Sequence, residues 1–146
     1  MTSKDPFDLG RFVTAQDGIF DIALDELHAG CKMSHWMWFV FPQLGGLGRS
    51  MRAQFYGLTS LDEARAYLAH PLLAQRLVSA TQAVLAHPHL AAHAIFGTPD
   101  DMKFHASMTV FERADGDASS PFRQAIDVFF GGVEHAPTVE LLSLSV

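Results

Sequence analysis

Prolines at the start of apolar, helix-like patterns constrain the fold more than any other feature of this sequence. Proline has a fixed φ and no N–H group, so it suits the first turn of a helix and disrupts a helix interior or a central strand. Such starts occur at Asp5-Pro6, His70-Pro71, Thr98-Pro99 and Ser120-Pro121. Glycines, which favour helix ends, close the patterns at Gly30, Gly57, Gly97 and Gly131-Gly132. These signals divide the chain into short helices.

Apolar residues between these signals recur at helical spacing. Ser60 and Glu63 form a capping box, and Leu73, Leu77 and Val84 mark the buried side of the helix that follows Pro71. The alternation of a half-buried strand is present only weakly, in the run Trp36–Phe41. We therefore predict an all-α, mainly helical fold with a single domain over residues 1–146. It is expected to be an irregular array of about seven or eight short helices.

The composition supports a buried core and excludes several classes of protein. Hydrophobic residues make up 49% of the chain and charged residues 18%, which excludes wholesale disorder. A net charge of −6 without a Lys/Arg cluster argues against a nucleic-acid partner. No apolar run approaches the roughly 20 residues that span a bilayer, so we expect no membrane partner. The start of the chain lacks the apolar segment of a secretory signal, so the expected location is cytoplasmic.

The single Cys31 excludes an intramolecular disulfide and a multi-cysteine metal site. His89 and His93 have the i, i+4 spacing of zinc ligands, with His87 nearby, but no acidic residue lies in this segment. Polar histidines at a helix junction explain the segment better. We expect no metal and no cofactor.

The first candidate site is the segment Ser34–Gln43, SHWMWFVFPQ. Trp36 and Trp38, two residues apart, can build a wall for a planar ring, or they can belong to the core. His35 opens the apolar run and is expected at its rim, where an imidazole can act as a base.

The second candidate is the glycine-bearing turn Gly45–Ser50, GGLGRS, which leads into a helix. Backbone N–H groups that converge at such a turn favour an anion, and Arg49 or Arg52 can clamp a phosphate. The spacing is not that of a P-loop, so a plain tight turn is the alternative.

The third candidate is the segment Asp100–Thr109, DDMKFHASMT. Asp101 and His105 are four residues apart and share a helix face, and so do Lys103 and Ser107. The first pair can orient an imidazole, and the second is compatible with Ser–Lys chemistry. Solvated surface contacts are the alternative for both pairs.

The tryptophan segment and the turn Gly46–Ser50 resemble a bacterial family of unknown function, domain-of-unknown-function family 1810. Its members are often labelled calpastatin by automated annotation. Further matching segments are Ser60–Pro71, Phe96–Lys103, Ser107–Phe111 and Gly131-Gly132 with Thr138. The resemblance covers nearly the whole chain and implies an almost all-helical single domain, but no activity. His105 and Ala106 depart from the family pattern.

Two hypotheses follow from these motifs. In the first, the three segments form a pocket for a small anionic ligand that is phosphorylated or nucleotide-like. The expected catalytic residues are His35 and Lys103, and the expected ligand-binding residues are Ser34, Trp36, Trp38, Gln43, Arg49, Ser50, Asp101, Ser107 and Thr109. In the second, the protein is a non-enzymatic assembly or protein-binding module whose tryptophans are core. Either a monomer or a homodimer fits, and the sequence names no reaction.

Overall fold

The computed structural model describes residues 5–144, and helices dominate this range. Its α-helices are α1 (Gly10–Gln16), α2 (Phe20–His28), α3 (Met37–Val40), α4 (Met51–Phe55), α5 (Leu61–Ala69), α6 (Pro71–Leu85), α7 (Ala92–Phe96), α8 (Asp100–Asp115), α9 (Pro121–Phe130) and α10 (Ala136–Ser143). A 3₁₀ turn, η1 (Gly45–Leu47), precedes α4. The β-type pairing described in this range is one bridge between Leu44 and Leu58.

The predicted all-α fold is confirmed, but the number of helices was underestimated. The described range holds ten α-helices, and α3 lies in the run that alternates weakly in the sequence. The side chains of Trp36, Met37 and Val40 are buried together in the core, and this shared burial stabilises the short helix α3. No helix in residues 5–144 is long and apolar enough to cross a membrane.

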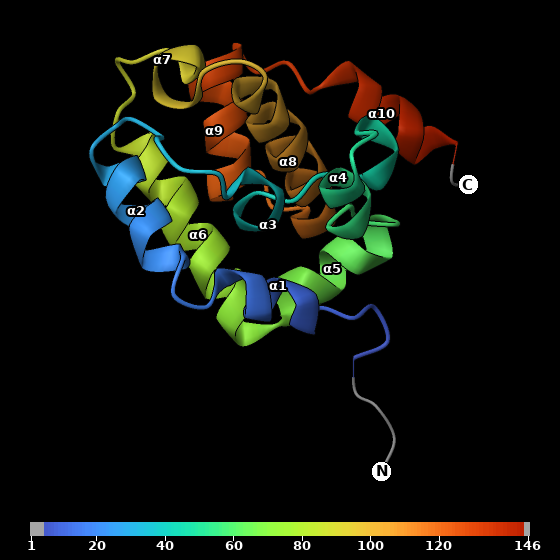
Figure 1. Ribbon diagram of the computed structural model, residues 1–146. Helices are drawn as coiled ribbons and strands as arrows, with labels where there is room; N and C mark the ends of the chain where they lie inside the picture. Colours follow the sequence, from blue (N-terminus) through green and yellow to red (C-terminus); the bar gives the residue numbers. More distant parts are fainter. Residues whose placement is uncertain (1–4, 145–146) are drawn as a thin grey trace.

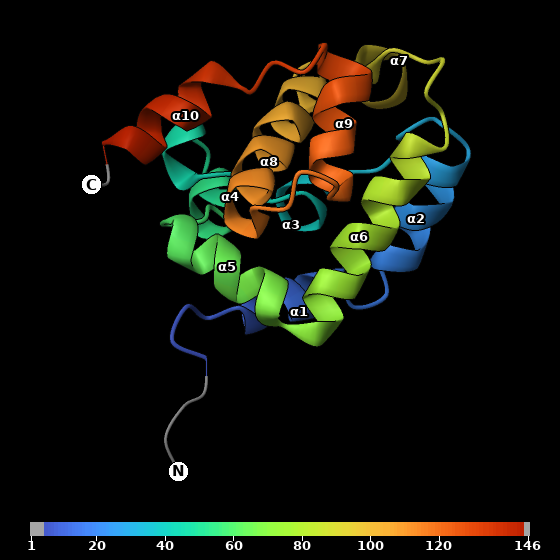
Figure 2. The same ribbon diagram turned by 180° about the vertical axis from the view of Figure 1, so that it is seen from behind.

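Helix α8 lies at the centre of the molecule (Figures 1 and 2). It packs against α5, α7, α9 and α10, while α6 packs against α2 and α9. Every residue from 106 to 111 is buried, which is typical of a core helix rather than of a surface helix. The ring of Phe104 lies 5.0 Å from that of Phe41 and 4.7 Å from that of Phe96, so aromatic contacts join α8 to α3 and α7.

The proline signals mark helix starts with different accuracy. Pro71 and Pro121 are the first residues of α6 and α9, as predicted. Pro99 was expected to be the first residue of α8, but it occupies the N-cap position, so the helix begins one residue later, at Asp100. Asp5-Pro6 does not begin a helix, because α1 starts only at Gly10. The Asp5 carboxylate instead accepts hydrogen bonds from the N–H groups of Leu9 and Gly10, at 2.6 and 2.8 Å.

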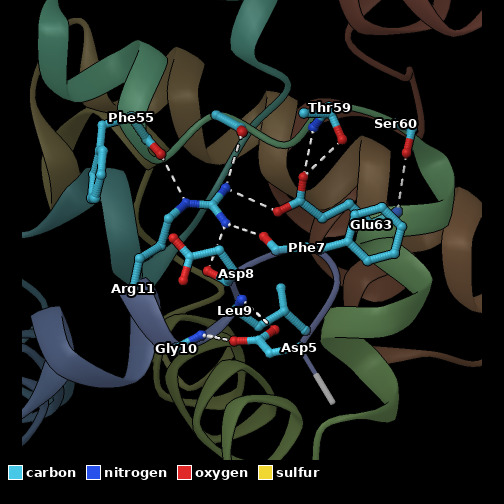
Figure 3. Close-up of polar contacts among 11 residues, drawn as sticks. Asp5, Phe7, Asp8, Leu9, Gly10, Arg11, Phe55, Thr59, Ser60 and Glu63 are labelled. Carbon is cyan, nitrogen blue, oxygen red and sulfur yellow. Dashed lines mark hydrogen bonds and ion pairs between the residues drawn. The ribbon is translucent and has the colours of Figure 1, made fainter. Parts of the chain in front are cut away.

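The guanidinium of Arg11 binds five oxygen atoms from three parts of the chain (Figure 3). It donates to the carbonyls of Phe7, Asp8, Phe55 and Gly57 and to Oε2 of Glu63, at distances of 2.7 to 3.2 Å. The side chain of Glu63 is 1% exposed. Its other oxygen, Oε1, accepts from the N–H and hydroxyl groups of Thr59. This buried ion pair therefore joins α1 to both ends of the turn between α4 and α5.

The same turn approaches η1 closely. A Cβ on Gly57 would lie 2.3 Å from the Cα of Gly45, so the close approach requires glycine at position 57. The two backbone segments that meet here are also joined by hydrogen bonds. Leu58 donates to the carbonyl of Gln43 at 2.9 Å, and Gly45 donates to the carbonyl of Leu58 at 3.0 Å. Arg11 thereby fixes the position of residues 43–45 as well.

We predict that Glu63→Ala lowers the free energy of unfolding by about 3–5 kcal/mol, because it leaves the Arg11 charge without its buried partner. Urea unfolding of the wild type and the variant measures the loss. Asp62→Ala is the matched control, since Asp62 is the exposed neighbour and lies 3.4 Å from Arg65. Its expected loss is below about 1 kcal/mol. Equal losses in the two variants would contradict the role assigned to Glu63.

Candidate functional site

A cleft of about 390 Å³ lies where η1, α4, α8 and α10 meet. Both ribbon views place α4 and α10 beside α8 (Figures 1 and 2). Its polar lining consists of Gln43, Arg49, Ser50, Lys103 and His135. Its apolar lining consists of Leu47, Ala53, Pro99, Met102 and Pro137. A narrow apolar extension shares Gln43, Ala53 and Lys103 with the cleft and is walled by Trp38, Phe41 and Tyr56.

The cleft is lined by basic groups and by no carboxylate of the described residues. Arg49 is exposed and forms no ion pair in residues 5–144. The Nζ atom of Lys103 lies 3.6 Å from Oδ1 of Asp100, but the other oxygen of Asp100 is 2.8 Å from Nζ of Lys32. Asp100 is therefore shared, and its contact with Lys103 is the longer of the two.

The indole ring of Trp38 positions two of the cations. The guanidinium of Arg52 lies 5.1 Å from the ring centroid, and Nζ of Lys103 lies 5.2 Å from it. Both distances are within the range of cation–π attraction. Trp38 thus holds Lys103 beside the cleft, whereas Arg52, on the same ring, does not line it.

The imidazole of His135 is fixed at the rim of the cleft by two buried threonines. Its Nδ1 atom lies 2.8 Å from Oγ1 of Thr138, and its backbone N–H donates to Oγ1 of Thr109 at 2.9 Å. Thr109 in turn donates to the carbonyl of His105. Burial, and then the charge of His105, lower the pKa of His135 from its ordinary value. The ring of His105 stacks on Phe130 with centroids 3.8 Å apart, and its burial lowers the pKa of His105 despite a hydrogen bond to the carbonyl of Val133.

The structure brings part of the predicted site together. Trp38, Gln43, Arg49, Ser50 and Lys103, which come from all three predicted segments, line the cleft or its extension. His35, the other expected catalytic residue, is exposed on the turn before α3 and does not line the cleft.

Ser34 and Trp36 are placed elsewhere, by the carboxylate of Glu26. This carboxylate accepts from the N–H and hydroxyl groups of Ser34, from the N–H of Met33 and from the indole Nε1 of Trp36, at 2.6 to 2.9 Å. Partial burial acts to raise the pKa of Glu26, but these hydrogen bonds outweigh it and lower the pKa to about 2. Trp36 is 0% exposed, so the expectation that it contacts a ligand is corrected: it belongs to the core.

Three expected residues on α8 also have other roles. Asp101 lies 3.8 Å from Nδ1 of His93, and His105 binds the carbonyl of Val133 instead. Ser107 is fully buried, and its hydroxyl has no hydrogen-bond partner among residues 5–144. Thr109 is likewise buried and supports His135 from beneath. Neither hydroxyl lines the cleft.

Two of the three histidines of the junction after α6, His87 and His93, contact nearby groups of the chain, and the third, His89, is exposed. Nε2 of His87 lies 3.0 Å from the carbonyls of both Leu27 and His28, at the end of α2. Nδ1 of His93 lies 2.9 Å from the hydroxyl of Thr98. Within the described part of the chain, no group of three or more metal-ligating side chains is present.

Sequence analysis did not identify His135 and Met102 as cleft residues. His135 lies outside the three motifs, and only the proline two residues later indicates that a helix begins there. Met102 has the sequence context of a core residue, yet it is 57% exposed at the start of α8.

The fold and the cleft define a small all-α protein with a basic site at the meeting point of three helices. The chain belongs to a family described as "Protein of unknown function (DUF1810)", whose model matches residues 6–142. It is similar to the conserved hypothetical protein Rv1873 from Mycobacterium tuberculosis, a crystal structure with 49% sequence identity and a TM-score of 0.92. That match covers 95% of this chain and 99% of the other. The comparison with curated proteins found no match.

We predict that Glu26→Gln lowers the free energy of unfolding by about 1–3 kcal/mol at pH 7, because it weakens hydrogen bonds to a charged acceptor. The folded-state pKa of about 2 is below the ordinary value of 4.5. The contribution of Glu26 is therefore full above pH 4.5 and is lost as the pH falls toward 2. The difference between wild type and variant should shrink over that range in urea unfolding measurements. Asp25→Asn, at the exposed neighbour, should show no such difference.

Proposed function

We propose that this protein binds a small anionic ligand, of the phosphorylated class, in the cleft between η1, α4, α8 and α10. One observation carries the proposal: Arg49, Lys103 and His135 converge on a cleft that no carboxylate of residues 5–144 lines. The chain has 16 acidic and 10 basic residues, so chance would favour an acidic lining. Gathering scarce basic groups in one concave place raises the local concentration of anions.

The size and chemistry of the cleft support a small molecule rather than a macromolecule. Its volume of about 390 Å³ falls in the range of small-ligand sites. Its lining combines an apolar wall, including Leu47, Met102 and Pro137, with a few polar groups, which is the usual composition of such sites.

At α8, the positive charge beside the cleft comes from a side chain, Lys103, rather than from backbone N–H groups. In the first turn of α8, the N–H groups of Asp101, Met102 and Lys103 already donate to the carbonyls of Gly97 and Pro99. The carboxylates of Asp100 and Asp101 further offset the positive end of this helix. Arg49 and Lys103 are therefore the residues whose removal tests the proposal most directly.

We predict that inorganic phosphate binds the wild-type protein, and that Arg49→Gln and Lys103→Met each weaken binding about tenfold or more, because each removes a charged contact. Isothermal titration calorimetry and thermal-shift titration measure the effect. Sugar phosphates and nucleotides then identify the preferred class of phosphorylated compound. Arg65→Gln is the matched control, since Arg65 is exposed on α5 and pairs loosely with Asp62.

Phosphate also stabilises proteins by exclusion from their surface, so the informative quantity is the difference between variants. Lys103→Met should change the unfolding free energy in buffer without ligand by less than about 1 kcal/mol, because its ion pair is long and partly exposed. Equal responses of the wild type, both cleft variants and the control would overturn the proposal. A concentration-dependent dimer without any ligand response would support the assembly-module alternative.

A further inference from the structure

We propose that His135 contacts the bound anion through Nε2 and carries a proton when it does so, so that ligand binding takes up one proton. This inference rests on the proposed function and identifies the residue that makes the cleft responsive to pH. It also adds to the cleft a contact that lies outside the three segments singled out in the sequence.

The geometry of the ring assigns this role to Nε2. Nδ1 faces the buried hydroxyl of Thr138 at 2.8 Å, and the backbone of His135 is held by Thr109. Nε2 is then the ring nitrogen left for a ligand, and it has no hydrogen-bond partner among residues 5–144. Since His135 lines the cleft together with Arg49 and Lys103, an anion bound between them is within reach of its ring.

Burial, and then the charge of His105, make the charged form of the His135 ring less favourable while the cleft is empty. The charged groups around the ring on α8 are Lys103 and His105, whose ring centroid lies 5.3 Å from that of His135. Arg49 precedes α4, and Glu140 is exposed on α10. The carboxylate of the preceding residue, Glu134, is held at 2.7 and 2.8 Å by Arg113. Burial and the basic neighbours therefore disfavour the charged imidazole.

A bound dianion reverses this balance. It places negative charge beside the ring, favours the imidazolium and gains a charge-assisted hydrogen bond from Nε2–H. The pKa of His135 is therefore higher in the complex than in the free protein. By linkage, affinity increases as the pH falls through the range between those two pKa values, by at most tenfold per pH unit for one proton.

Sulfate is the appropriate probe, because it remains a dianion throughout the range studied, whereas phosphate itself titrates. We predict that sulfate binds the wild-type protein about five- to tenfold more tightly at pH 6 than at pH 7.5. His135→Gln should bind sulfate within about twofold of the wild type at pH 8 and show no increase at low pH. His89→Gln, at an exposed histidine that does not line the cleft, is the matched control and should retain the pH dependence of the wild type.

Calorimetry in buffers of different ionisation enthalpy measures proton uptake in the wild-type protein directly and does not depend on the folding of any variant. The expected result is a net uptake of protons, of at most one proton per sulfate. Sulfate binding that depends on Arg49 and Lys103 but takes up no proton would overturn the assignment of His135 and leave the proposed function standing. Absence of sulfate binding at any pH would overturn the assignment of His135, and absence of both sulfate and phosphate binding would overturn the proposed function as well.

Discussion

The buried contact between Arg11 and Glu63 is the constraint on which the cleft depends. All five N–H groups of the guanidinium have an acceptor, and two of these are the carbonyls of Phe55 and Gly57. Because Gly57 lies against Gly45, a fixed turn after α4 also fixes the chain around η1. Gln43 precedes Gly45 and Arg49 follows it. The positions of both side chains in the cleft therefore depend on an ion pair that lies outside the cleft.

A second carboxylate, that of Glu26, fixes the position of the tryptophan segment. Its oxygen atoms accept hydrogen bonds from three N–H groups and one hydroxyl of residues 33–36. These bonds hold the turn of the chain that directs Trp36 into the core. Trp38, two residues later, then faces Arg52 and Lys103. One segment therefore supplies both a core anchor and a wall of the site.

Local signals predicted the fold well and the site only in part. The capping residue Ser60 and the prolines at 71 and 121 act over a few residues, so the sequence shows where α5, α6 and α9 begin. The three motifs also meet at one cleft. Arg11, in contrast, is 44 to 52 residues away from its partners Phe55, Gly57 and Glu63, and no local pattern indicates such a pairing. Glu63 illustrates the difference: it was recognised as a capping residue, but its carboxylate binds Thr59 and Arg11.

The walls of the cleft come from three distant parts of the chain: residues 43–53, 99–103 and 135–137. During synthesis, the first wall leaves the ribosome long before the last, so a nascent chain that ends before residue 135 lacks His135 and one wall of the cleft. Under the proposed function, a ligand would meet the complete cleft only after α10 has docked onto α8 and η1. In a growing cell, the ligand would distinguish finished molecules from unfinished ones and would protect only the finished ones against unfolding and proteolysis.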